Sequence, residues 1–96
     1  MTSNWYVYIV RCADDTYYTG IATDVALRVK KHNTGKGARY TSHRTPVTLA
    51  YYETAESRSE ASQQEYAIKR LSHAAKEALI HSPNNLVALH GTPENT

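Results

Sequence analysis

The chain has 96 residues, which is enough for one compact domain and too few for two. It has neither a run of about 18 apolar residues, which a membrane span requires, nor a basic and apolar leader at its N-terminus, so we predict a soluble, cytoplasmic protein. Its one cysteine, Cys12, excludes an internal disulfide and a cysteine-based zinc cluster, and its net charge of +2 is too small to identify nucleic-acid binding by itself.

Two β-branched and aromatic runs near the N-terminus, over residues 5–12 and 17–21, predict a β-hairpin. Thr23 offers an N-cap for the helix that follows, with Asp24 in its first turn. Residues 34–37, Thr-Gly-Lys-Gly, are typical of a helix end, because glycine readily adopts the left-handed conformation found there. The first third of the chain is therefore predicted to form two strands and one helix.

The middle of the chain predicts a third strand and two more helices. Valine, leucine and two tyrosines run together over residues 47–53, as in a strand. The segment 57–60, Ser-Arg-Ser-Glu, has the spacing of a capping box, which predicts a helix over residues 58–71. Ser72 can cap a further helix over residues 73–80.

The order of these elements, ββαβαα, indicates an α+β fold with a small three-stranded antiparallel sheet flanked by helices. We expect the domain to span residues 1–82. Residues 83–96 are predicted to form a partly disordered tail, which is frayed from Gly91 onward.

The lysines and arginines are concentrated in one part of the chain. Residues 34–46 are predicted to form a basic, mobile loop that Pro46 closes. The fifteen residues that end at Arg44 contain no acidic residue, which predicts a region of positive field; an ordinary solvated loop is the alternative. The basic residues of this region are Lys30, Lys31, Lys36, Arg39 and Arg44.

Glu65 is the first candidate for chemistry. On a helix it lies on the same stripe as Ala61 and Ile68, so it points along the face that should pack on the sheet. A carboxylate without a partner is costly there, so we expect it to meet an arginine, a metal ion or hydrogen-bond donors. A structural salt bridge is the alternative to a functional role.

Arg28 and His32 are four residues apart and are therefore neighbours on one helix face. Val25, Ala26 and Val29 mark the buried stripe of that helix, and Arg28 and His32 border it. We expect both side chains at the lip of the core, where they would line a shallow pocket. Solvated surface is the alternative.

Four tyrosines lie in the predicted hairpin. Alternation along a strand places Tyr6 and Tyr8 on one face, and either Tyr17 or Tyr18 must join them. Buried in a core, these rings would only pack. In one pocket with a guanidinium and a carboxylate, a phenol completes the functions that phosphodiester hydrolysis requires: proton transfer, binding of phosphate charge and a metal ligand.

At these positions the sequence resembles the GIY-YIG nuclease family. Tyr6-Val7-Tyr8 corresponds to the first motif of that family, and Tyr18-Thr19-Gly20 corresponds to the second. Arg28, His32 and Glu65 fall at the intervals where the family has its arginine, a frequent histidine and its metal-binding glutamate.

The resemblance covers residues 5–71. The segments 34–41 and 69–72 further resemble the small stand-alone bacterial members, the YhbQ-like group. Two positions depart from the family pattern, because Tyr6 stands in place of glycine and Thr19 in place of isoleucine. Neither departure removes a functional group.

The hairpin sets a geometric condition on such a site. A two-residue turn at Asp14-Asp15 would leave Tyr8 and Tyr18 on opposite faces of the sheet. Both phenols share one face only if the loop has an odd number of residues or a strand contains a bulge, and Gly20 suits irregular backbone.

The resemblance implies a role for each site residue. Glu65 is expected to hold one Mg²⁺ or Mn²⁺ ion, and Arg28 is expected to bind the scissile phosphate. Tyr8 is expected to be the base for the attacking water. His32 is expected either to relay the proton or to hydrogen-bond the phosphate, and Tyr18 to orient either the water or Tyr8. Contacts with the sugar-phosphate backbone are assigned to Lys31, Lys36, Arg39 and Arg44.

The function that follows is a metal-dependent nuclease that hydrolyses DNA, with RNA not excluded as a substrate, in DNA repair, recombination or turnover. One alternative is a catalytically weak nucleic-acid-binding module with the same fold. Another is a protein-interaction domain whose tyrosines form a contact patch. The preferred DNA structure, the mode of cutting, protein partners and the oligomeric state are not predicted.

Overall fold

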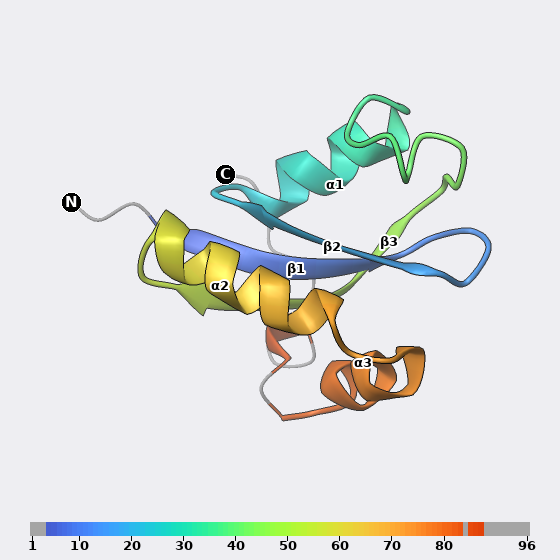
Figure 1. The fold of residues 1–96 in the computed structure, drawn as a ribbon. Coiled ribbons are helices and arrows are strands. Elements are labelled where there is room, and N and C mark those ends of the chain that lie inside the picture. Colours follow the sequence, from blue (N-terminus) through green and yellow to red (C-terminus); the bar gives the residue numbers. More distant parts are fainter. Residues whose placement is uncertain (1–3, 84, 88–96) are drawn as a thin grey trace.

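The computed structural model describes residues 4–83 and 85–87. Strands and helices form in the predicted order, and the α+β prediction is confirmed (Figure 1). Predicted and observed boundaries differ by at most two residues. The elements are β1 (Trp5–Arg11), β2 (Tyr17–Ala22), α1 (Val25–Asn33), β3 (Thr48–Ala55), α2 (Arg58–Lys69) and α3 (His73–Ile80).

The strands form one antiparallel sheet in the order β2-β1-β3, so β1 is central and β2 is an edge strand. The helix α1 covers one face of the sheet, while α2 and α3 cover the other (Figure 1). Alternate residues of β1 therefore supply two separate cores. The α1 side contains Tyr8, Val10, Leu49 and Val25, and the α2 side contains Val7, Ile9, Ala61 and Ile68.

The hairpin has the odd loop that places Tyr8 and Tyr18 on one face. The Cys12 N–H donates to the Thr16 carbonyl at 2.8 Å, which leaves three residues in the loop. Asp15 has a φ of 66°, as hairpins of this length require at that position. The β1–β2 register runs without a shift, so the loop alone meets the geometric condition.

Each helix begins at a side chain that accepts a backbone N–H. At α1 this residue is Asp24 and not the predicted Thr23. A carboxylate is favoured there because the helix dipole is positive at its N-terminus. Ser57 and Ser72 cap α2 and α3 as predicted. The capping box of α2 is shifted, since Glu60 accepts the N–H of the residue before Ser57 at 2.7 Å.

A bulge in β3 is held in place by a residue of the predicted tail. The pairing of β1 with β3 shifts between Ile9 and Val10, which leaves Ala50 as the extra residue. Asn85 is buried, and its Nδ2 donates to the carbonyls of Ala50 at 2.9 Å and Ile80 at 2.7 Å. The start of the predicted tail is therefore part of the packed fold.

The remainder of that tail, including Gly91 onward, lies outside the described residues. The domain boundary at residue 82 and the cytoplasmic location stay predictions. No helix within residues 4–83 and 85–87 combines the length and apolar character needed to cross a membrane.

Candidate active site

Tyr8 lies in the middle of the α1 side of the sheet, where its side chain is 1% exposed. It pairs with Gly20 of β2, and Tyr18 follows on the same face. A Cβ atom on Gly20 would lie 2.6 Å from Tyr8 Oη and 2.8 Å from its Cζ. Gly20 is thus needed as space for the phenol, and not for the irregular backbone that the sequence suggests.

A chain of hydrogen bonds runs from Tyr8 into the loop after α1. Tyr8 Oη lies 2.8 Å from His32 Nε2, and His32 Nδ1 lies 2.8 Å from Thr41 Oγ1. The Thr41 hydroxyl donates to the Ala38 carbonyl at 3.2 Å. Because a carbonyl only accepts and a hydroxyl has one proton, Thr41 must accept from His32 Nδ1–H. In the neutral imidazole Nε2 then accepts, so Tyr8 donates to His32.

His32 is 0% exposed and so belongs to the core, which corrects the expectation that it lies at the lip. Burial lowers the pKa of His32, and the nearby positive charge of Arg28 lowers it further. A Cβ atom on Gly37 would lie 2.5 Å from His32 Nδ1 and 2.7 Å from its Cα, so the loop packs directly over the imidazole. Helical periodicity misses this burial because the covering comes from the loop.

Arg28 remains at the lip, half-buried, as expected. Its Nη2 donates to the Gly37 carbonyl at 3.1 Å, which fixes the guanidinium beside the loop. Burial raises the pKa of Tyr8 to about 12, and the positive charge of Arg28 acts in the opposite direction. At neutral pH Tyr8 is therefore protonated and His32 is neutral, in agreement with the direction of their hydrogen bond.

Glu65 reaches the site from the other side of the sheet. It lies on the predicted packing stripe of α2 with its side chain 23% exposed, and its Oε2 lies 3.3 Å from Lys69 Nζ. Lys69 Nζ in turn lies 6.0 Å from the centroid of the Tyr18 ring. Because β2 is an edge strand, side chains of α2 can extend past it toward the tyrosines. Burial is the main cause of the raised pKa of Tyr8, and the charge interactions with Tyr18 and then with Glu65 raise it further.

A single partly exposed carboxylate suits a magnesium-type ion. Among the described residues, no three His, Cys, Asp or Glu side chains lie close enough together to bind one metal ion. Mg²⁺ commonly binds through one or two carboxylates and completes its shell with water and substrate phosphate oxygens. Glu65 fits this requirement, since its carboxylate is partly exposed beside Lys69.

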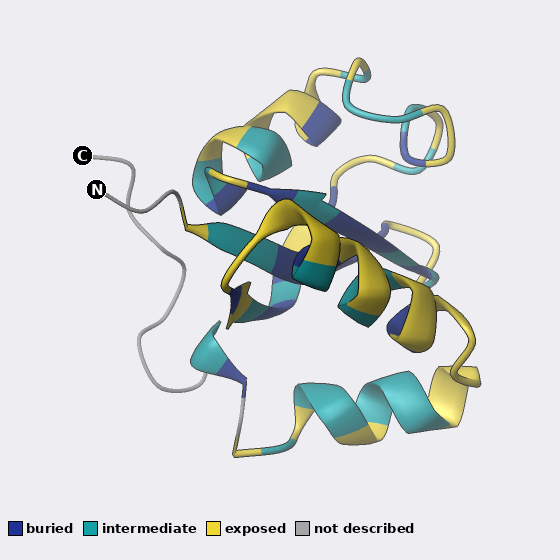
Figure 2. Cartoon of the chain, turned by 60° about the vertical axis from the view of Figure 1, so that its left-hand side comes forward, coloured by how far each residue is buried: buried dark blue, intermediate teal, exposed yellow. Residues whose placement is uncertain are grey.

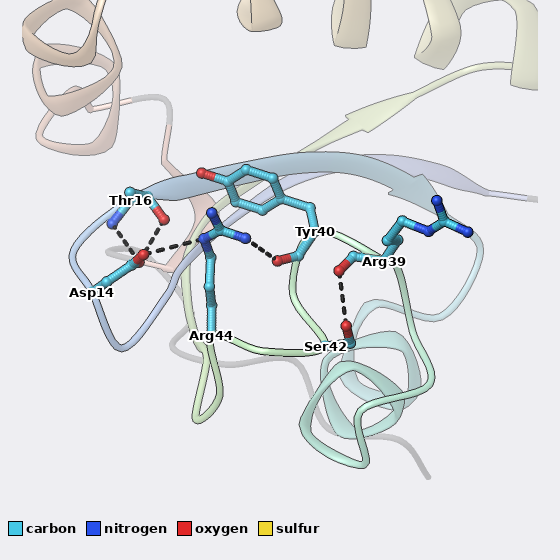
Figure 3. A network of polar contacts seen from close by, with 6 residues as sticks. All are labelled: Asp14, Thr16, Arg39, Tyr40, Ser42 and Arg44. Carbon is cyan, nitrogen blue, oxygen red and sulfur yellow. Dashed lines mark hydrogen bonds and ion pairs between the residues drawn. The ribbon is translucent and has the colours of Figure 1, made fainter.

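The basic loop is anchored to the hairpin through Arg44 (Figure 3). Arg44 Nε donates to Asp14 Oδ2 at 3.1 Å, and its Nη1 donates to the Tyr40 carbonyl at 2.8 Å. The guanidinium also lies 4.0 Å from the centroid of the Tyr40 ring. The Ala13 N–H donates to the Arg44 carbonyl at 2.8 Å. These contacts anchor a loop that the sequence predicts to be mobile. They also pair the charge of Arg44 within the protein.

The other residues assigned to nucleic-acid contacts point their charge outward. Lys31, Lys36 and Arg39 are exposed, and Arg39 meets Ser42 only through its own carbonyl, which accepts the Ser42 hydroxyl at 2.8 Å (Figure 3). The exposed charges therefore come from Lys31 at the end of α1 and from Lys36 and Arg39 in the loop, and Arg44 serves as the anchor of the loop.

A family model described as the GIY-YIG catalytic domain matches residues 4–78, which include Tyr8, His32 and Glu65. The chain belongs to the GIY-YIG family. The family is a nuclease superfamily, and the predicted recognition is thereby confirmed.

Individual GIY-YIG relatives match over most of the chain. The UPF0213 protein DP2720 of Desulfotalea psychrophila is 58% identical over 77 residues, which are 79% of this chain and 70% of the relative. The UPF0213 protein VNG_2274C of Halobacterium salinarum is 58% identical over 75 residues, 78% of this chain and 97% of the relative. The NMR structure of the protein EF2693 from E. faecalis is 33% identical with a TM-score of 0.55, and covers 97% of this chain and 93% of that one.

Two contributions to the site of this GIY-YIG protein are missed by sequence reasoning. Thr41 orients His32, yet nothing in the sequence distinguishes it from the other hydroxyl residues of the loop. Lys69 pairs with Glu65, and its i,i+4 spacing on a helix is a signal that was available. The motif spacing thus points to the candidate site residues themselves and not to the side chains that orient them.

Proposed function

We propose that this GIY-YIG protein is a metal-dependent nuclease that hydrolyses DNA phosphodiester bonds, in repair, recombination or turnover of DNA. The observation that carries the proposal is the convergence of three functions around one edge strand. The oriented chain from Tyr8 through His32 to Thr41 can move a proton, Arg28 can bind phosphate, and Glu65 can hold a metal ion. RNA shares the same scissile group and is a further candidate substrate.

The proton path follows from the direction of the hydrogen bonds. The attacking water gives a proton to Tyr8 Oη while the phenol proton passes to His32 Nε2, 2.8 Å away. The imidazolium that forms keeps its Nδ1–H bond to Thr41. With a pKa of about 12, Tyr8 needs this acceptor and the positive charge of Arg28 to act as a base.

Phosphate binding is assigned to Arg28, which is half-buried at the lip and fixed by the Gly37 carbonyl. A guanidinium binds phosphate oxygens with charge-assisted hydrogen bonds and stabilises the additional charge of the transition state. A bound Mg²⁺ or Mn²⁺ at Glu65 would supply Lewis-acid stabilisation of the departing 3′-oxygen. Tyr18 is placed beside the His32 ring, with centroids 5.2 Å apart, where it can orient water.

One observation favours a second candidate, a nucleic-acid-binding module that does not cut. Glu65 already has a counter-ion in Lys69, so its carboxylate needs no metal ion for charge balance. In that case the basic loop would bind nucleic acid and the core tyrosines would only stabilise the fold.

Cleavage of labelled single-stranded, duplex and branched DNA with Mg²⁺, Mn²⁺ or EDTA separates the two. If the protein is a nuclease, the wild type cleaves DNA with metal ions and not in EDTA, and the Glu65→Ala and Tyr8→Phe variants lose the activity. Glu56→Ala is the matched control. It removes an exposed carboxylate just before the same helix, and this carboxylate forms no ion pair with a described residue. Binding without cutting by the wild type, in all metals, would overturn the nuclease proposal.

A further inference from the structure

The outward side of α2 has a shallow hollow that the proposed chemistry does not use. Its volume is about 610 Å³. Figure 2 shows that the helix has exposed residues along its outward side. Tyr66 is 63% exposed there. We define the α2 surface as the lining residues of the hollow together with Arg70: Arg58, Ser59, Ser62, Gln63, Tyr66 and Arg70.

Two arginines of the α2 surface are oriented by aromatic rings and are not neutralised. The Arg58 guanidinium lies 5.9 Å from the centroid of the Trp5 ring, and that of Arg70 lies 5.4 Å from the Tyr66 centroid. Arg70 Nη1 also donates to Tyr66 Oη at 3.1 Å. In the described part of the chain, neither arginine forms an ion pair with a carboxylate. Both charges are therefore available to an anionic partner.

The α2 surface adjoins the candidate active site. With 3.6 residues per turn, Arg58, Ser62 and Tyr66 form one row along the helix, and Glu65 borders this row on the side of the sheet. Arg58 and Arg70 are twelve residues apart, which corresponds to about 18 Å along the axis at about 1.5 Å per residue. Glu65 lies between the two arginines along the axis, so a strand that passes Glu65 can meet Arg58 on one side, along the hollow, and Arg70 on the other.

We propose that the α2 surface binds the sugar-phosphate backbone of the substrate strand, away from the scissile phosphate. The inference rests on the proposed function, because it takes the occupant to be the nucleic acid held at Glu65. The chemistry is complementary: the arginines match phosphate charge, and the hydroxyls of Ser59 and Ser62 and the amide of Gln63 are hydrogen-bond donors for phosphate or sugar oxygens. Such contacts position the strand without reading its sequence.

The test is the salt dependence of DNA binding in EDTA, measured by fluorescence anisotropy with labelled oligonucleotides of increasing length. Each lost phosphate contact lowers the slope of log K against log salt by about 0.7–0.9, so Arg58→Gln/Arg70→Gln should lower it by about 1.4–1.8. The control Lys76→Gln removes one positive charge from α3 and should leave the slope unchanged. Oligonucleotides too short to extend beyond the active site should bind the double variant and the wild type with equal affinity.

The outcomes separate the two proposals. If wild-type protein binds and cuts DNA but the double variant keeps the wild-type slope at every length, the α2 surface does not bind DNA and only this inference fails. If the slope falls as expected while no variant or metal supports cutting, the nuclease proposal fails and the α2 surface stands. Absence of DNA binding by the wild type overturns both, and an acidic protein partner then becomes the alternative occupant.

Discussion

Replacing Gly20 with alanine should destabilise the protein by breaking the bond between Tyr8 and His32. The new Cβ would lie 2.6 Å from Tyr8 Oη, so the phenol must move, and this movement disturbs its 2.8 Å hydrogen bond to His32. Overpacking costs about 1–3 kcal/mol. The unpaired His32 nitrogen costs about 1–3 kcal/mol more. Reduced freedom of the unfolded chain returns about 0.4–1 kcal/mol, so we expect a net loss of about 1–6 kcal/mol.

A double-mutant cycle with Tyr8→Phe tests this explanation. The single change Tyr8→Phe leaves His32 without its donor and should cost about 1–3 kcal/mol. In the double variant that bond is lost only once, so the total should fall short of the sum of the single changes by about 1 kcal/mol or more. The free energies of unfolding come from urea titrations followed by circular dichroism.

Tyr52 supplies the matched control for this cycle. It lies beside Tyr8 on the same face of the sheet, is 5% exposed, and forms no side-chain hydrogen bond with a described residue. Tyr52→Phe should therefore combine additively with Gly20→Ala. Additivity of the Tyr8 pair within about 0.5 kcal/mol would refute the coupling of Gly20 to the hydrogen bond.

Three further changes test other parts of the structure. Asn85→Ala should lower the free energy of unfolding by about 1–3 kcal/mol, because it leaves carbonyls at the β3 bulge and the end of α3 without their donor. Urea titration measures this loss, and an unchanged free energy of unfolding would place Asn85 outside the packed fold. Lys69→Gln should tighten metal binding at Glu65 about two-fold, since a surface i,i+4 ion pair stabilises by about 0.3–0.5 kcal/mol; calorimetry with Mn²⁺ measures this, and weaker binding would contradict it. Acidification should destabilise wild-type protein more than His32→Gln. Folding lowers the pKa of His32, so its contribution is present above the unfolded value near 6.5 and is lost as the pH falls below it. The free energies of unfolding of both proteins are measured by urea titration from about pH 5 to pH 8. The same pH dependence for both would show that His32 is not buried as a neutral group.

The elements could be predicted because their signals are local. The serines that cap α2 and α3 satisfy N–H groups three residues away, and a capping signal of this length is read directly from the sequence. The motif spacing also selects Tyr8, Arg28 and Glu65, and in the structure the charges of Arg28 and Glu65 both act on the Tyr8 phenol. Their roles in catalysis stay predictions.

The errors concern contacts between segments that are distant in the chain. The burial of His32 depends on a loop that folds back over α1, and Gly20 is required because a ring on the neighbouring strand passes over it. Asn85 satisfies the bulge at Ala50, thirty-five residues earlier. Periodicity and capping rules carry no information about such contacts, because each partner by itself has an ordinary local sequence.

The proposed base and its proton acceptor are also core residues, and this has an evolutionary consequence. Tyr8, His32 and Thr41 are fully buried, so drift at these positions is opposed by selection for folding whether or not the chemistry is needed. Arg28 and Glu65 are only partly buried and are under no such double constraint. A lineage that abandoned cutting should therefore change Glu65 and Arg28 first and retain the tyrosine, histidine and threonine as a remnant of the former site.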